Sequence, residues 1–326
     1  MKIYLEDEAW VSCTFDLAGT PRQLGKTKER KVVHSNNGNK ELLTVEDRYI
    51  TEQFKCKLTA KQWGGLFALI GGAVVGFVGA VVVLAAVVLS GPVGWCIFGA
   101  IATAAIIGTV TGSIATGIAL ACNDCTDPLK AGKWNNASET VFINKEAAIF
   151  YNVSTLDCSN GGILLASRSK EDANKLSNDM KWNARFELGA QILSNAISGG
   201  VAGLGTLDQD GDLDLATVPL AIASYIDNDF LHPERTPKDA AIRGLWYSAA
   251  GYGLGYAKYI PGAPPFLGNV GTEFSVTDLV TTGVMTMLGY ASDKLEEWLN
   301  DNNEEIIDKE KGNLPEFGNG DIVAEK

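Results

Sequence analysis

Six cysteines are the residues of this 326-residue chain whose type and spacing are best suited to chemistry. One of them, Cys96, lies inside a long apolar stretch. The other five lie before and after that stretch, where the sequence is rich in strand-forming residues: Cys13, Cys56, Cys122, Cys125 and Cys158. Grouped thiols of this kind are typical either of a metal site or of ordinary buried cysteines.

The start of the chain, MKIYLEDEAW, has acids where a secretory signal carries basic residues, and no apolar run follows it. We therefore expect synthesis in the cytoplasm without a signal peptide. Structural disulfides are rare in that compartment, which leaves metal binding and plain burial as the two roles for the cysteines. Only the interval Cys122-x-x-Cys125 matches a familiar pair of zinc ligands, and on spacing alone both roles stay open.

A second group of candidate ligands is an acidic loop in which aspartates alternate with other residues, as in the calcium loop of an EF-hand. The aspartates are Asp208, Asp210, Asp212 and Asp214. Leu213 stands where such a loop needs glycine, and Pro219 stands where it needs a bidentate glutamate. A solvated acidic turn between two helices therefore fits this segment better than a calcium site at Asp208, Asp210 and Asp212.

Patterns of known catalytic sites are absent from the sequence. It contains no HExxH, no GxSxG and no phosphate-binding loop. The two histidines, His34 and His232, stand in no recognisable context, which leaves little for histidine-based nucleophilic or hydrolytic chemistry. Chemistry that uses carboxylates alone, as in glycoside hydrolysis, stays open. We therefore expect a non-enzymatic action, with an enzyme as the alternative.

The formal net charge of −12 bears on the partners of the chain. Binding to nucleic acid needs clustered lysine and arginine, so we expect no nucleic-acid partner. Much of the negative charge lies near the C-terminus, where residues 301–326 form an acidic tail that need not be folded.

No charged residue occurs between Lys61 and Asp124, and the remaining elements must be arranged around this gap. Two apolar arms, residues 66–89 and 93–121, flank a Ser-Gly-Pro turn, and each is long enough to cross a bilayer as a helix. We expect a membrane-competent helical hairpin over residues 63–121. The alternatives are a hairpin buried inside a soluble fold, or one that a partner shields until delivery.

Glycine pairs in the two arms predict how the hairpin packs. Gly72-x-x-x-Gly76 lies in the first arm and Gly108-x-x-x-Gly112 lies in the second. Such pairs let two helices approach closely. We therefore expect the two helices of the hairpin to approach each other closely.

The segments on either side of the hairpin, residues 1–62 and 122–166, both consist of short strand patterns separated by turns. In the second, residues 140–143 and 147–150 predict a β-hairpin, and residues 159–162 predict a tight turn. Each piece is too short to close a core alone. We expect both to form one β-domain that carries the apolar hairpin as an insertion at a loop.

Five segments of these two pieces, taken in order, resemble the motifs of the PAAR-like spike-tip family. That family has a GA-x-L-x-C-S opening, a V-x-D step, an F-G-x-C step, a P-C-x-P…W step and a C-x-x-G-G close. The matching segments are residues 10–15 (WVSCTF), 43–47 (LTVED), 54–56 (FKC), 125–128 (CTDP) with Trp134, and 154–162 (STLDCSNGG). The resemblance covers residues 1–62 and 122–165.

The resemblance implies a small β-cone that caps the trimeric VgrG-type spike of a contractile injection apparatus, such as type VI secretion. It also implies a structural zinc ion near the point of the cone. Its ligands would be Cys13, Cys56, Cys125 and Cys158, with Cys122 as a substitute for Cys125. A small cone has little interior, so a four-cysteine zinc site supplies the cross-linking that a core cannot.

Two residues of the first β-rich piece need separate comment. Lys55 departs from the family pattern, which has glycine at that position. His34 is a candidate metal ligand, because plain PAAR tips use histidine ligands, but a solvated histidine on a strand fits that position better.

Tip proteins of this kind also carry apolar helices, which are associated with cargo that enters or crosses a recipient's membrane. The resemblance therefore implies export by the injection apparatus without a signal peptide, in competition between bacteria. It further implies a chaperone that guards the helices in the producer, an immunity protein, and the recipient membrane as target.

Residues 167–300 predict a helical domain. The last helix is expected to run from a cap at Thr277 and Asp278 to about Leu299, with an apolar face. The helices are rich in glycine, which is unfavourable in exposed helices and so indicates close packing. Two kinds of domain fit: a compact soluble bundle, or one that opens to insert into a bilayer as colicin-like pore formers do.

The predicted fold is therefore α+β, with a split PAAR-like β-cone, an inserted apolar helical hairpin and an all-α C-terminal domain. The expected domains are residues 1–62, 63–121, 122–166, 167–300 and the tail 301–326. The favoured function is a spike-tip effector that permeabilises a recipient membrane. One alternative is an enzymatic C-terminal toxin that the hairpin only carries across. Another is an integral membrane protein of the producer.

Overall fold

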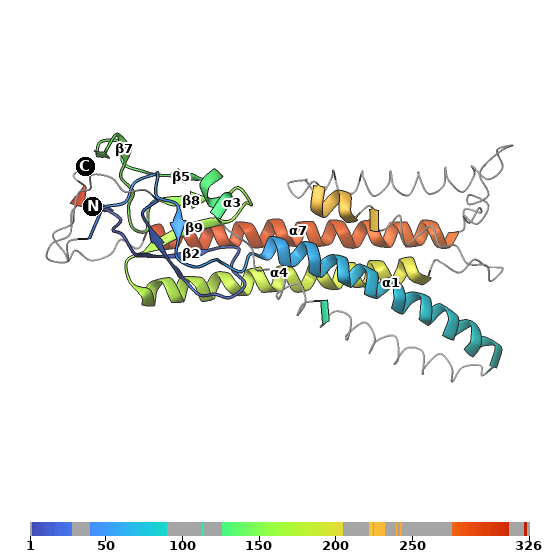
Figure 1. Cartoon of the computed structure of the whole chain (residues 1–326). Coiled ribbons are helices and arrows are strands. Elements are labelled where there is room, and N and C mark those ends of the chain that lie inside the picture. Colours follow the sequence, from blue (N-terminus) through green and yellow to red (C-terminus); the bar gives the residue numbers. More distant parts are fainter. Residues whose placement is uncertain are drawn as a thin grey trace. The chain divides into compact units, whose positions relative to one another are not determined.

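A computed structural model describes residues 2–27, 40–89, 112–113, 126–204, 222–223, 225–231, 239, 242, 276–312 and 323–324. It is a mixed α+β structure with a curled antiparallel sheet and long helices (Figure 1). The strands are β1 (Lys2–Ile3), β2 (Ala9–Cys13), β3 (Arg22–Gly25), β4 (Tyr49–Ile50), β5 (Lys133–Asn135), β6 (Phe142–Ile143), β7 (Glu146–Ala147), β8 (Thr155–Asp157), β9 (Ile163–Ser167) and β10 (Val323–Ala324). The helices are α1 (Lys57–Leu89), α3 (Thr126–Ala131), α4 (Lys170–Leu204), α7 (Val276–Gly312) and the π-helix η1 (Ile226–Leu231).

The chain divides into two compact units, each built from separate segments. We call Met1–Leu58, Ala121–Phe186 and Trp298–Lys326 the β-unit, and Thr59–Leu120 and Glu187–Glu297 the helical unit. The helices α1, α4 and α7 each contribute residues to both units. The coarse α+β prediction is therefore confirmed.

The main sheet of the β-unit has six strands in the order β4-β3-β2-β9-β8-β5. Its central pair joins β2 to β9, with Trp10 opposite Ser167 and Cys13 opposite Leu164. The sheet therefore combines strands from both β-rich pieces of the sequence. Two smaller pairings, β6 with β7 and β1 with β10, complete the described strands.

The buried residues of β9 explain how the β-unit forms two apolar layers. Leu164 packs in the main core with side chains from β2, β3 and β8, among them Val11, Leu24 and Leu156. The next residue, Leu165, points to the other face because side chains alternate along a strand. There it packs against helix residues: Leu176, Met180 and Ile307. A strand that is buried on both faces has a continuous apolar sequence, and β9 (ILLAS) largely follows this pattern.

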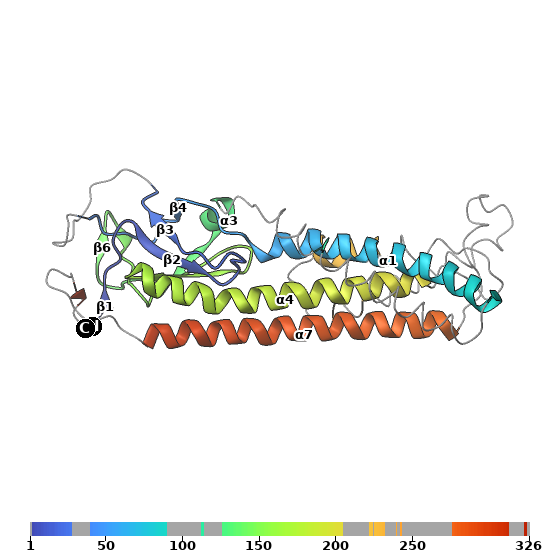
Figure 2. The same cartoon turned by 90° about the horizontal axis from the view of Figure 1, so that it is seen from below.

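The N-terminal half of α4 covers that second face (Figure 2). Its first turn is closed by Ser169, whose hydroxyl accepts a hydrogen bond from the amide of Asp172 and donates one to the Asp172 carboxylate. The bond from the Asp172 amide to the serine hydroxyl is the one that an N-cap residue makes. Further along, Ser12 of β2 donates to the carbonyl oxygen of Ala173 over 2.9 Å, which ties the helix to the sheet.

The predicted hairpin and turn in the second β-rich piece are both present. Strands β6 and β7 flank Asn144 and Lys145, whose φ angles of 52° and 75° suit the tight turn of a two-residue hairpin. The hairpin is shorter than predicted, because Ile149 pairs elsewhere and accepts a hydrogen bond from the Leu5 amide. Gly161 occupies the predicted tight turn with a φ of +87°.

Two helices extend further than the sequence predicts. Helix α4 is continuous over the polar residues before 188 and the apolar residues after them. Helix α7 continues beyond Leu299 to Gly312, so the first part of the predicted tail is helical. Ile306 and Ile307 explain the extension, because they pack on the β-unit.

In the helical unit, α1 and α4 meet through small residues. A Cβ atom on Gly72 would lie 2.2 Å from the carbonyl oxygen of Ala196, and one on Gly199 would lie 2.0 Å from that of Leu69. Gly72 therefore allows close approach to α4, and the predicted packing of the first arm on the second stays a prediction. Gly112 would meet no atom within 4 Å, and the rest of that arm lies outside the described residues.

Within the part of the chain that the structure describes, one helical stretch has the length and composition to cross a membrane. It is Lys57–Val75 of α1, and 44% of its most apolar window is buried.

Candidate metal centre

Three of the four cysteines predicted as ligands lie in the main core of the β-unit. Cys13 ends β2, Cys56 directly precedes α1, and Cys158 follows β8. Cys13 and Cys56 are buried, and Cys158 is half-buried against the same cluster. The segment of Cys56 joins that of Cys13 through a bridge between Asp16 and Cys56 and a hydrogen bond from the Lys57 amide to the Phe15 carbonyl. The fold thus gathers thiols that are far apart in sequence.

Backbone amides donate hydrogen bonds to two of the sulfur atoms. The Phe15 amide donates to Sγ of Cys13 over 3.4 Å. The amides of Asn160 and Gly162 donate to the sulfur of Cys158, because the turn after Cys158 folds back over it. Donors of this kind favour the charged thiolate over the thiol, and a thiolate is the form that binds a metal ion.

The two glycines of the turn after Cys158 bring its backbone close to Cys13. A Cβ atom on Gly162 would lie 3.3 Å from Sγ of Cys13 and 3.3 Å from the ring of Phe15. Gly161 adopts a positive φ, which side chains other than glycine rarely allow. The two glycines therefore allow the turn after Cys158 to lie close to Cys13 and Phe15 without a steric clash.

Burial opposes the ionisation of these thiols. Burial raises the pKa of Cys13 well above its usual value, the Phe15 amide opposes this, and the nearby Cys56, Asp16 and Cys158 raise the pKa further. Burial also raises the pKa of Cys158, against its two amide donors. A bound divalent cation would supply the positive charge that stabilises neighbouring thiolates. Cysteine sulfur is a donor type that zinc prefers, but the three described thiols are not spaced to hold a metal ion by themselves.

The fourth predicted ligand, Cys125, lies outside the described residues, as do Cys122 and Cys96. Helix α3 begins at the next residue, Thr126, and the Ser159 amide donates to the carbonyl of Pro128 over 3.1 Å. The described start of this segment is thus tied to the turn after Cys158. Among the residues described, no three His, Cys, Asp or Glu side chains are spaced to hold a metal ion by themselves.

The remaining candidate ligands are not described. The acidic loop with Asp208, Asp210 and Asp212 lies outside the described residues, and so do His34 and His232.

Lys55, which replaces the glycine of the family pattern, does not use a conformation that requires glycine. The described non-glycine residues with positive φ are Glu8, Asn136, Asn144, Lys145 and Asn152, and Lys55 is not among them. Its carbonyl oxygen accepts from the Leu17 amide, and its amide donates to Asp16. The departure from the pattern is therefore compatible with the local fold.

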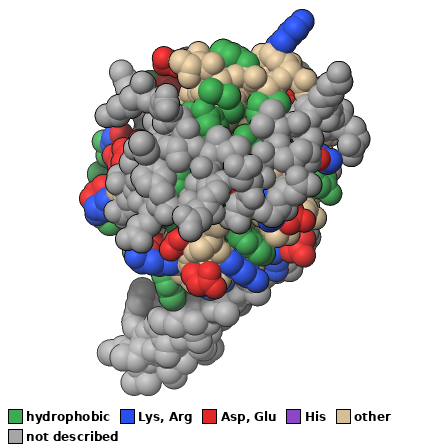
Figure 3. Space-filling view, turned by 90° about the vertical axis from the view of Figure 1, so that its left-hand side faces the viewer, with side chains coloured by type: hydrophobic (Ala, Val, Ile, Leu, Met, Phe, Trp, Pro, Cys, Tyr) green, Lys and Arg blue, Asp and Glu red, His purple; other side chains and the backbone are tan. Residues whose placement is uncertain are grey.

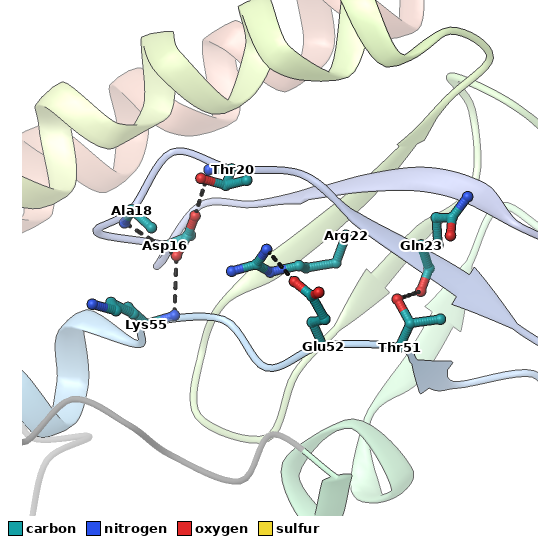
Figure 4. A network of polar contacts seen from close by, with 8 residues as sticks. All are labelled: Asp16, Ala18, Thr20, Arg22, Gln23, Thr51, Glu52 and Lys55. Carbon is teal, nitrogen blue, oxygen red and sulfur yellow. Dashed lines mark hydrogen bonds and ion pairs between the residues drawn. The ribbon is translucent and has the colours of Figure 1, made fainter.

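Asp16 is a central residue of the site that sequence reasoning missed. Its buried carboxylate accepts hydrogen bonds from the amides of Ala18, Thr20 and Lys55 over 3.2, 3.0 and 3.0 Å (Figure 4). It thereby fixes the segment after Cys13 to the segment before Cys56. The sequence carried only a weak signal for this role, an aspartate followed by a Gly-Thr-Pro turn.

Asp47, from the V-x-D step, plays a similar part on the other side of the unit. Its carboxylate accepts from the amides of Thr27 and Thr44 over 2.9 and 2.8 Å. Its carbonyl oxygen accepts from the indole of Trp134 over 3.0 Å. Two residues of the segments that resemble the family motifs are thus joined directly by a hydrogen bond in the core.

The surface charges bear on nucleic-acid binding, which needs clustered lysine and arginine. On the face drawn in Figure 3, acidic and basic side chains of the described residues are interspersed, and no extended basic area is visible. Among the described residues, several opposite charges form ion pairs, such as Arg22 with Glu52 and Lys26 with Glu41.

Comparison with models of protein families finds no match to this chain, and searches of curated proteins and of solved structures find none either.

Proposed function

We propose that this chain is a PAAR-like tip protein that caps a trimeric VgrG-type spike of a type VI-like injection system. The observation that supports this best is the sheet of the β-unit. It takes strands from both β-rich pieces and places three motif cysteines, Cys13, Cys56 and Cys158, in one core. The apolar insertion begins where the first piece ends.

We assign a structural zinc ion to the thiol cluster. Cys13, Cys56 and Cys158 would hold it together with Cys125, or with Cys122 in its place. Bound zinc would supply positive charge and cross-link the segments of the small unit. The amide donors to Cys13 and Cys158 support this assignment because they favour thiolates.

We further propose that the protein acts on the membrane of a recipient cell by permeabilising it. The uncharged sequence after Lys61 and the membrane-length stretch of α1 support this action. Export would need no signal peptide, because the injection apparatus carries the chain. A chaperone for the apolar helices and an immunity protein in the producer complete the proposal, which places the protein in competition between bacteria.

Co-purification with a VgrG-type spike tests the tip assignment. Wild-type protein should bind the spike and contain about one zinc ion per chain, the number that a four-cysteine site holds. Cys158→Ser should lose the metal and the spike binding, measured by metal analysis and pull-down. Cys96→Ser is the matched control and should keep both. Wild-type protein without zinc, or Cys158→Ser with unchanged zinc, would contradict the metal assignment.

Membrane potential in cells that express the protein tests the permeabilising action. Val74 is 58% exposed, so Val74→Glu should leave the fold intact while placing a charge in the apolar run of α1. A charge at the centre of a membrane helix costs about 3 kcal/mol, so this variant should no longer collapse the potential. Trp182→Glu, at another exposed apolar side chain, is the control and should act like wild type. Killing by the wild type without a loss of potential would favour an enzymatic toxin.

A further inference from the structure

One carboxylate of the helical unit joins three of its helices. Nζ of Lys61 in α1 lies 2.6 Å from Oε2 of Glu296 in α7. Nε2 of Gln191 in α4 donates to the same oxygen over 2.9 Å. The side chains of Lys61 and Glu296 are only 10% and 26% exposed, and Gln191 is buried. This junction is therefore a charged, mostly dehydrated contact between three helices.

Tyr225 closes the same end of α1. Its hydroxyl lies 3.0 Å from the carbonyl oxygens of both Lys61 and Gln62. Gly65 makes room for it, because a Cβ atom there would lie 2.1 Å from the hydroxyl oxygen. The first turns of α1 in the helical unit are thus held by side chains from several elements.

Further along α1 the contact changes character. Around Gly72 and Gly199 the helices α1 and α4 touch backbone to backbone. Lys61 is the last charged residue of the sequence before Asp124. An apolar helix of this composition is compatible with a helix bundle and with lipid. The ion pair and hydrogen bonds of Lys61, at the charged end of α1, can form in the helix bundle but not in lipid.

We propose that the junction of Lys61, Glu296 and Gln191 is a latch that holds α1 against α4 and α7 in water. Its opening would precede the entry of α1 into a bilayer, and this last step rests on the proposed function. A buried ion pair favours one arrangement of its helices, because the pair forms only in a specific geometry. Loss of one partner leaves the other charge dehydrated and unpaired, which is unfavourable. The latch therefore selects one position of α1 among the many that apolar packing alone would permit.

Hydrogen exchange of the full-length protein in water measures the opening of α1 directly. Glu296→Gln removes the charge but keeps the shape, and should speed the exchange of α1 amides in residues 59–75 by about tenfold, the usual effect of losing one charge-assisted hydrogen bond. Glu297→Gln is the matched control. Glu297 is the next residue of α7 and pairs with Lys294 of its own helix. In the Glu297→Gln variant, the α1 amides should therefore exchange as fast as in wild type. Unchanged exchange in Glu296→Gln, or equal acceleration in Glu297→Gln, overturns the latch.

A charge swap separates the latch from general destabilisation. Lys61→Glu and Glu296→Lys should each speed the exchange of α1. The double variant, which restores an ion pair with reversed direction, should exchange more slowly than either single variant. A double variant that exchanges as fast as the faster single variant overturns the proposal.

Dye release from vesicles of phosphatidylethanolamine and phosphatidylglycerol distinguishes failure of the latch from failure of the proposed function. Glu296→Gln should release dye at several-fold lower protein concentration than wild type. If exchange responds to the variants and no protein releases dye, the latch stands and the membrane action is contradicted. If wild type releases dye and Glu296→Gln matches it in exchange and release, the latch is contradicted and the membrane action stands.

Discussion

At the scale of single residues, the β-unit is organised by buried polar groups as much as by its apolar core. The carboxylates of Asp16 and Asp47 are almost completely buried and are surrounded by backbone amides. Each fixes two segments that are separated in the sequence. A charged acceptor with several amide donors forms stronger hydrogen bonds than a neutral one, so these aspartates determine the paths of the loops around the thiols.

Replacing Asp16 with alanine should therefore lower the stability of the β-unit. Three amides would lose their acceptor, and we expect a loss of about 3 kcal/mol in the free energy of unfolding. Urea denaturation of the full chain, followed by near-UV circular dichroism, measures the change. Asp301→Ala, at an exposed position on α7, should leave the midpoint unchanged, and equal effects of the two variants would contradict the assigned role of Asp16.

Sequence patterns predicted the thiols of the candidate site but not the carboxylates. Cys13, Cys56 and Cys158 were found because each stands in a short motif that recurs in one order. The role of Asp16 was not predicted, because it accepts hydrogen bonds from backbone amides. Such bonds depend on the path of the chain and leave no periodic pattern in the sequence. Asp47 was noticed as a motif residue, yet its contact with the indole of Trp134 follows only from the structure.

At the scale of elements, the helices combine segments that look unrelated in sequence. The polar first half of α4 covers the sheet, whereas its glycine-rich second half packs on α1. The sequence does not predict one continuous helix here, because the residues that pack on the sheet and those that pack on α1 differ in composition. The end of α7 was missed for a related reason, since Ile306 and Ile307 stand within a charged run that resembles a solvated tail.

The crossing of α1 and α4 gives a sharp prediction at this scale. Gly199→Ala should lower the thermal stability of the helical unit by several degrees, because its Cβ atom would lie 2.0 Å from the carbonyl oxygen of Leu69. Gly200→Ala is the matched control. Its Cβ atom would lie 3.7 Å from the carbonyl oxygen of Gly72, an ordinary contact. Alanine also favours the helix by up to about 1 kcal/mol, so the control should be neutral or stabilising.

Thermal melts of the two variants, followed by circular dichroism at the helical band, provide the comparison. A Gly199→Ala protein as stable as wild type would show that the backbone contact between these helices is not required.

At the scale of the whole molecule, the first and last parts of the chain fold together. Residues from Trp298 onward belong to the β-unit. Asn183 donates to Asn303 over 2.8 Å, and Ile307 closes the apolar layer on Leu165. The strand β10 near the C-terminus pairs with β1 near the N-terminus. The described end of α7 and the strand β10 are therefore part of the folded β-unit.

Truncation tests this dependence. A chain that ends at Glu297 should fail to give soluble, folded protein, because Leu165 and Met180 would lose the packing of Ile307. A chain that ends at Gly312 keeps that packing and should remain folded, with only the pairing of β10 removed. Size-exclusion chromatography and circular dichroism of both proteins measure the difference. Equal folding of the two chains would contradict a structural role for the end of α7.

The division of the chain also has a mechanical consequence. The backbone passes between the two units after Leu58, Leu120, Phe186 and Glu297, so four covalent connections join them. A single cut by a protease would leave the other three intact. A force applied to the β-unit would therefore be shared among four backbone connections, whereas two domains joined by a single linker carry it through one.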